Sequence, residues 1–418
     1  MGDVPADVDL DPGSIEFISH RFEHFEELRR TCPVAFDGAH GGFWLVTDYD
    51  SVVAVANDNE TFAHKYDLDA SDGVTYHGIC GIPRVPNNPR LGVAEIDGPD
   101  HRDLRRALNP VFTPPAVERL RPTIERITTW FLDQHIESGS ADLVLDFTSP
   151  VPAVLTLQMM GLPCENWEHY AEFFHASSAH PNGSPGYLAA VGRAPDMMAE
   201  LLEYATYRRA HPGADLTSLL LQLELSGRAL SDLDVTEILW NLVAGGLDTT
   251  TALTSWALHH LGTHPESRAR LVAEPALLPT AVEEFLRFYS PNENLTRTAS
   301  RDVELGGRRI RRGDRVWISW VSGNHDANAF EAADDVVLDR APNRHLAFGL
   351  GGHRCIGSHL ARAETMVMLR EVLRRIPDYE IDVARFQPYP GNPLMTGVVT
   401  MPATFPPGPR AGPPDRPF

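Results

Sequence analysis

Hydrophobic positions recur with helical spacing along most of this chain. Residues 116–136, AVERLRPTIERITTWFLDQHI, place apolar side chains three or four positions apart, as one face of an amphipathic helix requires. From residue 151 onward such stretches dominate, and small or turn-forming residues interrupt them at 175–197, which predicts a mobile segment. A short apolar run predicts a strand at 43–49, and alternating polar and apolar positions predict a half-buried hairpin at 308–320. The chain is therefore expected to be mainly helical with small sheets.

The longest helical stretch covers residues 231–262, SDLDVTEILWNLVAGGLDTTTALTSWALHHLG. Ser231 can cap its first turn, where two aspartates meet the positive end of the helix dipole. The stretch is apolar nearly all round, as expected of a helix that crosses the core. Gly245 and Gly246 each cost about 1 kcal/mol relative to alanine in a helix interior, so a local opening is expected there. That opening either has a function or is a simple kink in a buried helix.

The 418-residue chain is 43% hydrophobic, which is enough for a large core, and no flexible linker divides its interior. Residues 1–401 are therefore predicted to form one large domain. Segment 402–418 is rich in proline, which removes backbone donors and fixes φ, so it is predicted to be an extended or disordered tail. Proline and glycine also concentrate at 73–99, which predicts a long irregular loop that is either functional or disordered.

The formal net charge of −21 disfavours general nucleic-acid binding, which needs a basic face to displace counterions from phosphates. The N-terminus has neither the basic start nor the apolar run of a signal peptide, and no stretch reads as long and apolar enough to span a bilayer. A cytoplasmic protein without membrane contact is expected.

The four cysteines, Cys32, Cys80, Cys164 and Cys355, are far apart and form no CxxC pair, which disfavours a zinc ribbon or a disulfide framework. Cys355 stands among four glycines in FGLGGHRCIG, just before a helical stretch. A helix N-terminus favours thiolate over thiol. Such a thiolate is either a nucleophile or a metal ligand, and the alternative is a buried cysteine that packs as a small hydrophobe.

The loop FGLGGHRCIG matches in full the pattern Phe-Gly-x-Gly-x-His-x-Cys-x-Gly and so resembles the heme-binding loop of the cytochrome P-450 superfamily, in its soluble bacterial type. The resemblance implies a single mainly α domain with small β-sheets, in which heme b lies between the long central helix and the cysteine loop. It implies that Cys355 is the proximal thiolate ligand of the iron. It also places four further loop residues at the heme: Phe348, Gly349, His353 and Gly357.

Other segments are similar to the family's landmarks in the same order. AGGLDTT resembles the oxygen-binding groove, so Ala244 and Gly245 are expected at the heme, and Asp248 and Thr249 as the acid-alcohol pair that delivers protons. HRDLR resembles a clamp for the heme propionates, formed here by His101 and Arg105, and Arg297 and His353 match two further propionate residues. Glu284 and Arg287 resemble the family's Glu-x-x-Arg pair, with Arg340 as the expected third member in a structural role.

The resemblance implies an oxidoreductase, a heme-thiolate monooxygenase of bacterial secondary metabolism. It would hydroxylate or epoxidise a mostly apolar small molecule of the terpenoid, steroid, macrolide or fatty-acid class. Two electrons would come from NAD(P)H through a ferredoxin reductase and a ferredoxin, which is expected to dock near Arg102, Arg106 and Arg362. A heme-binding sensor or carrier without turnover stays open as an alternative. A peroxide-driven enzyme is disfavoured because Asp248 and Thr249 are both present, and a cysteine hydrolase would be colourless.

The substrate-facing segments that the resemblance implies include 65–92, the segment 175–197 and the turn near Met395. SPNENLTR carries three polar residues where many family members have small apolar ones. Glu293 or Asn294, with Asn241, is therefore expected to contact a polar group of the substrate, because apolar pockets use a few placed polar groups for orientation. Equally, these side chains could point to water or backbone at a bend. Leu247 is the remaining candidate contact.

Overall fold

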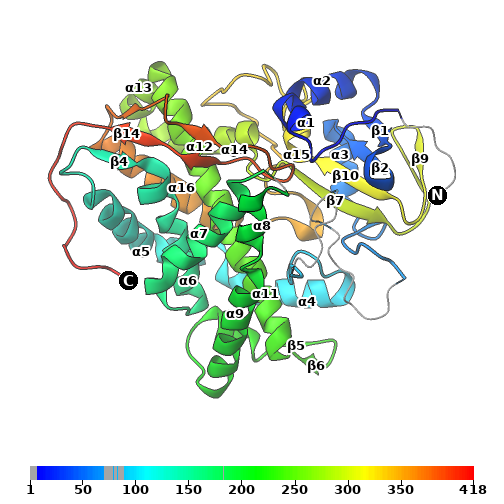
Figure 1. Cartoon of the computed structure of the whole chain (residues 1–418), viewed down its shortest axis with the longest axis horizontal. Helices are drawn as coiled ribbons and strands as arrows, with labels where there is room; N and C mark the ends of the chain where they lie inside the picture. The colour runs from blue at the N-terminus through cyan, green and yellow to red at the C-terminus, as the bar shows by residue number, and fades with distance from the viewer. Residues whose placement is uncertain (1–6, 70–78, 80–81, 83–88, 182) are drawn as a thin grey trace.

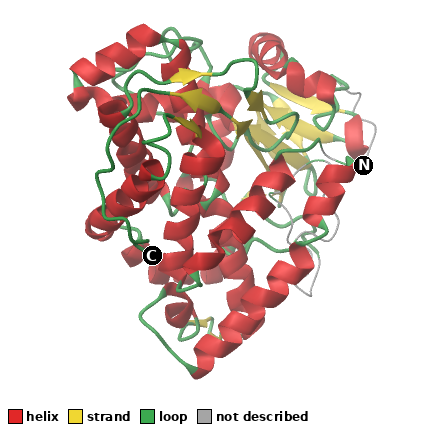
Figure 2. Cartoon of the chain, turned by 60° about the vertical axis from the view of Figure 1, so that its left-hand side comes forward, coloured by secondary structure: helices red, strands yellow, loops and turns green. Residues whose placement is uncertain are grey.

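Helices make up most of the fold and gather beside a five-stranded sheet. The computed structural model describes residues 7–69, 79, 82, 89–181 and 183–418. The larger sheet lies on the N-terminal side in Figure 1, and the helical mass lies beside and below it. Figure 2 shows the strands mainly toward one end of the molecule, with helices filling the rest. The predicted fold class, mainly α with small β-sheets, is confirmed.

The α-helices are α1 (Ile15–Ser19), α2 (Arg21–Thr31), α3 (Tyr49–Asn57), α4 (Gly98–Leu108), α5 (Pro114–Asp133), α6 (Pro150–Met160), α7 (Trp167–Ser178), α8 (Pro185–Val191), α9 (Ala194–Ala210), α10 (Leu216–Leu220), α11 (Asp232–Gly246), α12 (Asp248–Thr263), α13 (Pro265–Ala273), α14 (Leu278–Tyr289), α15 (Trp320–Asn324) and α16 (Ser358–Arg375). The strands are β1 (Val34–Asp37), β2 (Phe43–Val46), β3 (Phe62–Ala63), β4 (Ser140–Asp142), β5 (Glu224–Leu225), β6 (Arg228–Ala229), β7 (Asn294–Ala299), β8 (Val303–Leu305), β9 (Arg308–Ile310), β10 (Arg315–Ser319), β11 (Glu380–Ile381), β12 (Gln387–Pro388), β13 (Val398–Thr400) and β14 (Pro402–Thr404).

The five-stranded sheet has the order β1-β2-β10-β7-β3. Strands β2 and β10 are parallel, and the other neighbours are antiparallel. The predicted strand at 43–49 is confirmed by β2. The predicted hairpin at 308–320 is wrong, because β9 pairs with β8 while β10 enters the large sheet. All five residues of β10 are buried, as expected of a central strand.

The central helix is divided into α11 and α12, which meet at Leu247. As expected, Ser231 caps α11 by accepting from the Asp234 backbone amide, within a capping box. Helix α12 packs against α16, the helix that follows the cysteine loop, and α16 also packs against α5. This packing sets the cysteine loop opposite the break between α11 and α12.

The structure tests two expectations about mobile or irregular segments only in part. Segment 175–197 carries helix α8, together with the end of α7 and the start of α9, and its mobility stays a prediction. Most of the loop 73–99 lies outside the described residues. Its described end, residues 89–97, lies on α11, where the Gly92 amide donates to the carbonyl of Glu237.

The tail from residue 402 is more ordered than its proline content predicts. Its first three residues form β14, which pairs with both β4 and β11. The rest has no helix or strand and runs along α5, where the Phe418 ring stacks on Phe131 at 5.7 Å. The side chain of Asp133 accepts from the backbone amides of Ala411 and Gly412. The expectation that the tail forms no regular structure is therefore wrong at Pro402–Thr404, and the rest of the tail packs on the protein without a helix or strand.

The expectation that no stretch is long and apolar enough to span a bilayer is wrong, because Leu143–Met160 meets that test by length and composition. This stretch contains α6, and 72% of it is buried inside the protein. A core helix of a water-soluble protein meets the same criterion, so the stretch is weak evidence for membrane contact.

Candidate functional site

A cavity of about 840 Å³ lies between the break in the central helix and the cysteine loop. Apolar side chains from α6, α7, α11 and α12 form much of its wall, and Cys355 and Thr249 both line it. A second pocket of about 570 Å³, near α5 and α10, contains none of the predicted site residues. Most of the predicted site residues therefore line the larger cavity.

The cysteine loop is a tight turn that presents Cys355 to this cavity. The amide of Cys355 donates to the carbonyl of Phe348 at 2.8 Å, which closes the loop. Gly351 has φ of +64°, and a Cβ there would lie 2.8 Å from the Ala56 carbonyl oxygen, so only glycine fits. Helix α16 begins at Ser358, just after the loop. The side chain of Cys355 is exposed to the cavity, although protein surrounds it on all other sides.

The charge state of Cys355 depends on what lies in the cavity. Burial raises the pKa of its thiol above the ordinary value, although the Gly357 amide and Arg105, Arg354 and Arg362 oppose that rise. The thiolate expected at a helix N-terminus is therefore not favoured by the protein alone. A metal cation at the sulfur would supply the missing positive charge, because a coordinating thiol loses its proton.

The glycine pair opens the central helix, as predicted. Helix α11 ends at Gly246 and α12 begins at Asp248, while Leu247 between them has φ −81° and ψ −73°. A Cβ at Gly246 would lie 2.7 Å from the hydroxyl oxygen of Thr156, whereas a Cβ at Gly245 would meet no atom within 4 Å. Gly246 therefore permits close packing, and Gly245 leaves the cavity wall open.

The acid and the alcohol that follow the break are held differently. The Thr249 hydroxyl donates to the carbonyl of Gly245 at 2.8 Å. Both carboxylate oxygens of Asp248 accept from the Tyr389 hydroxyl at 2.8 Å, and Nδ1 of His175 lies 3.8 Å from Oδ1 of Asp248. Burial and the negative charge of Asp248 raise the pKa of Tyr389 well above its ordinary value, so the phenol keeps its proton and donates.

At the other end of the cavity, four basic side chains come together: His101 and Arg105 from α4, Arg297 from β7, and His353 from the cysteine loop. The rings of His101 and His353 stack at 3.7 Å. Burial lowers the pKa of His101 to about 4 and that of Arg297 to about 10. Nε of Arg297 and Nε2 of His101 are buried and have no hydrogen-bond partner among the described residues.

Buried nitrogens without partners are costly unless an acceptor reaches them. A dianionic group at this end of the cavity would satisfy them, and the two propionates of heme are such a group. Cys355 offers a thiolate to iron in the same cavity. The residues present therefore fit heme, with Cys355 at the iron and with His101, Arg105, Arg297 and His353 at the propionates.

His64, which the sequence analysis missed, lies behind this cluster. Its ring lies tilted against that of His353, with the two centroids 3.6 Å apart, and its Nδ1 lies 3.0 Å from Oδ1 of Asp97. His64, Asp97 and His353 have ligand atoms within 4.8 Å of one another, which is close enough to hold a metal ion. A single histidine after a short strand carries no pattern that could have revealed this position.

Of the predicted substrate contacts, some line the cavity and others do not. Asn241 and Met395 line the cavity, but the amide oxygen of Asn241 accepts from the backbone amides of Val93 and Ala94, so it also holds that loop. Leu247 is buried and is not among the lining residues. The remaining lining residues predicted at the heme are Ala244, Gly245, Phe348, Gly349 and Gly357.

Glu293 and Asn294 do not reach the cavity, and their prediction as substrate contacts is not supported. Oε1 of Glu293 is 2.8 Å from Nη2 of Arg21, and the amide of Asn294 donates to the carbonyl of Pro393. Asn292, one position earlier, lines the cavity instead. At the bend after α14, Asn292 thus faces the cavity, whereas Glu293 and Asn294 face away from it.

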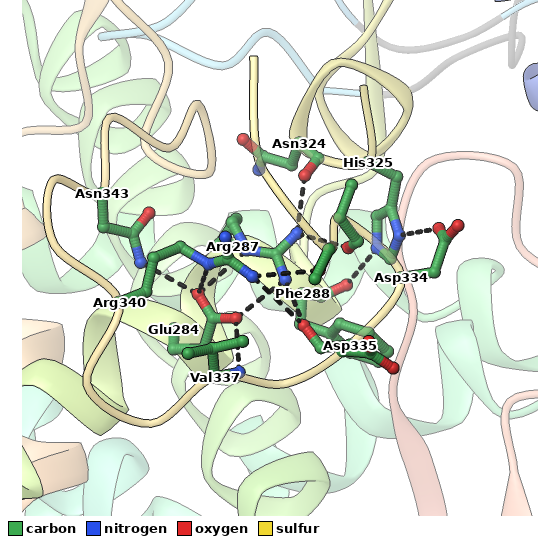
Figure 3. A network of polar contacts seen from close by, with 12 residues as sticks. Glu284, Arg287, Phe288, Asn324, His325, Asp334, Asp335, Val337, Arg340 and Asn343 are labelled. Carbon is green, nitrogen blue, oxygen red and sulfur yellow. Dashed lines mark hydrogen bonds and ion pairs between the residues drawn. The ribbon is translucent and has the colours of Figure 1, made fainter. Parts of the chain in front are cut away.

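Beside the cavity, Glu284, Arg287 and Arg340 form the predicted network, which is confirmed (Figure 3). Glu284 and Arg287 are fully buried and meet in two hydrogen bonds of 2.8 and 2.9 Å. Arg340 donates to the same carboxylate at 2.9 Å. Arg287 also donates to three backbone carbonyls, those of Asn324, Ala333 and Asp335. The network joins α14 to the segment that leads into the cysteine loop.

Comparisons with known proteins find relatives in both sequence and structure. The family model for cytochrome P450 matches residues 196–402. The chain is 32% identical over 366 residues to the polyketide biosynthesis cytochrome P450 PksS of Bacillus subtilis, covering 87% of this chain and 89% of that protein. It is 31% identical over 412 residues to the steroid C26-monooxygenase of Mycolicibacterium smegmatis, covering 96% of each. Among solved structures, Mycobacterium marinum CYP268A2 in complex with pseudoionone matches with a TM-score of 0.87 and 30% identity over 97% of this chain and all of that one.

Proposed function

This chain belongs to the cytochrome P450 family of monooxygenases, and we propose that it hydroxylates or epoxidises a mostly apolar small molecule with electrons from a ferredoxin. One observation carries the proposal: one mainly apolar cavity is faced by Cys355, by the break at Gly245–Thr249 and by the basic cluster, in which the buried Nε2 of His101 and Nε of Arg297 have no partner among the described residues. A cysteine hydrolase has no use for a buried anion site, so that alternative loses its support.

When bound, heme supplies the activation of dioxygen and the insertion of one oxygen atom into the substrate. Cys355 would hold the iron through its thiolate, and the basic cluster would bind the heme propionates. Thr249 presents a hydroxyl at the open wall of the cavity, where it holds a proton at Oγ1. Asp248, one residue earlier, moves protons from the protein interior toward that wall. Apolar side chains exclude water that would otherwise divert the reaction.

The lining of the cavity supports the substrate class. Its wall is mainly apolar, and its volume of about 840 Å³ has to hold heme as well as the substrate. Asn292 and the amide nitrogen of Asn241 are the polar groups that we propose for orienting the substrate. The names of two relatives fit this substrate class, because one is a polyketide biosynthesis enzyme and the other is a steroid monooxygenase.

The absorption spectrum of the reduced protein with carbon monoxide tests the proposed function. A heme with a thiolate ligand shifts its Soret band strongly to the red, so the purified protein should be coloured and should show that band. A screen of terpenoids, steroids, macrolides and fatty acids for the shift that follows displacement of iron-bound water then narrows the substrate. A colourless protein would overturn the proposal.

Replacing Thr249 by alanine should uncouple electron use from product formation. Product formation is expected to fall roughly 10²-fold, the lower end of what positioned proton transfer contributes, while peroxide accumulates. Oxygen uptake and product should be measured together. Thr263→Ala is the matched control, because Thr263 donates to the carbonyl of His259 in the same way but at the far end of α12. A sensor or carrier without turnover would show no difference between the two variants.

A ferredoxin should dock beside the cysteine loop, where α4 presents Arg102 and Arg106 to solvent. Arg362 is a weaker candidate than expected, because Glu283 binds its guanidinium at 2.5 and 2.7 Å. Arg102→Gln should lower the rate of reduction by an acidic ferredoxin several-fold at low salt, and the difference should vanish as salt screens the charges. Arg309→Gln, on the distant β9, is the control. A rate independent of ionic strength contradicts this docking site.

A further inference from the structure

His175 and Tyr389 form a cluster with Asp248, and these two residues have no role in the sequence-derived account. The three residues come from α7, from the residue after β12, and from the first position of α12. The exposed fraction of the His175 side chain is 12% and that of Asp248 is 7%. A carboxylate and an imidazole that are this buried and this close are costly unless they are paired or used.

Hydrogen bonds fix which nitrogen of His175 exchanges its proton. Nε2 lies 2.9 Å from the carbonyl oxygen of Val399, which can only accept, so Nε2 keeps its hydrogen. The other nitrogen, Nδ1, therefore carries the proton that comes and goes. Nδ1 faces the Tyr389 hydroxyl at 3.3 Å, and that hydroxyl donates to Asp248 at 2.8 Å. The three groups thus form a continuous chain from Nδ1 to the carboxylate.

The backbone around Tyr389 leaves space for these three hydrogen-bonded groups. A Cβ at Gly397 would overlap the ring of Tyr389, so glycine at that position lets the ring lie flat against the hairpin and reach Asp248. The amide of Tyr389 donates to the carbonyl of Gly397 at 3.0 Å, which fixes the two segments side by side. Tyr389 also contacts His175 edge-on, with ring centroids 5.7 Å apart.

We propose that His175 supplies protons to Asp248 through the Tyr389 hydroxyl, a role that rests on the proposed function of Asp248. In this step the N–H bond at Nδ1 breaks as a proton passes to the oxygen of Tyr389, and the O–H bond of Tyr389 breaks as its own proton passes to Asp248. Imidazolium becomes neutral imidazole, the carboxylate becomes a carboxylic acid, and Tyr389 is unchanged. Water at the exposed edge of His175 then restores its proton.

The electrostatics support this role. Burial lowers the pKa of His175, but the hydrogen bond and negative charge of Asp248 outweigh it, so the net pKa lies above 6.5. The groups that face His175 are Asp248, Tyr389 and, at longer range, Asp142 from β4, together with the Val399 carbonyl. His175 is therefore charged below its raised pKa and neutral above it. The supply of protons should fall as pH rises through that value.

The test measures oxygen uptake by the heme-loaded protein from pH 5.5 to 8.5, with NADPH, a surrogate ferredoxin and ferredoxin reductase, and no added substrate. His175→Gln and Tyr389→Phe should each lower the rate at pH 6.5 at least about tenfold and remove the fall that the wild type shows at higher pH. His169→Gln is the matched control, because His169 lies on the same helix and pairs with Glu200 away from the cavity. Unchanged rates and profiles in both variants overturn the inference.

A titration of His175 by NMR adds a readout that does not depend on turnover. In the reduced, carbon monoxide-bound protein, which is diamagnetic, the pKa of His175 should lie above 6.5, and Asp248→Asn should lower it by about one unit or more. A pKa at or below 6.5 overturns the inference while the proposed function stands. A wild type without the red-shifted band instead overturns the proposed function, and this inference with it.

Discussion

Glu284→Gln is expected to reduce the free energy of unfolding by roughly 3–5 kcal/mol, the cost of leaving a buried charge without its partner. Arg287 is fully buried and keeps its charge, since a guanidinium does not deprotonate in proteins. The neutral amide would also weaken the hydrogen bonds from Arg340, Asn343 and the Val337 amide, all of which converge on the same carboxylate (Figure 3). Urea unfolding of the heme-loaded protein, followed by circular dichroism, measures the change.

Glu118→Gln is the matched control for this prediction. Glu118 and Arg121 form an ion pair with the same i,i+3 spacing on α5, and their contacts of 2.7 Å match those of the buried pair. The difference is exposure, because most of the Glu118 side chain is in solvent. Water therefore replaces the lost partner, and little measurable change in unfolding is expected. Equal effects of the two substitutions would contradict the structural role assigned to Glu284.

Local patterns predicted the parts of the site that lie within one helix or one loop. The glycine pair predicted the break at Leu247, because adjacent glycines lower the stability of a helix and so mark where it is interrupted. The glycines of the cysteine loop predicted its tight turn, because glycine adopts positive φ and permits close backbone contacts. Both signals are local properties of the backbone, and a sequence shows such properties directly.

The sequence could not show partners that folding brings from far away. Glu293 was expected to face the substrate, but Arg21, 272 positions earlier, binds its carboxylate. Tyr389 and Asp248 are 141 positions apart, and neither stands in a motif that names the other. The proline content predicted extended backbone in the tail. The contact of the tail with Phe131 depends on the ring of the terminal residue, Phe418, which proline content does not indicate. Each of these positions is decided by tertiary contacts, which leave no periodic pattern.

Cys355→Ser should abolish both the red-shifted carbon monoxide band and measurable turnover. A serine hydroxyl keeps the size and position of the thiol but does not ionise to a comparable ligand, so the electron donation that a thiolate gives to iron is lost. The basic cluster at His101, Arg105, Arg297 and His353 is untouched by this change. Heme is therefore expected to remain bound through its propionates, with an ordinary Soret position.

Cys32→Ser and Cys164→Ser are the controls for this substitution, since both are free cysteines that do not line the cavity. Burial raises the pKa of both thiols, so neither offers a thiolate at neutral pH. Both variants should keep the band and the activity of the wild type. The comparison separates loss of the iron ligand from loss of heme binding. Loss of the band with heme retained identifies Cys355 as the ligand. A full band in Cys355→Ser would mean that the iron takes its thiolate from another residue.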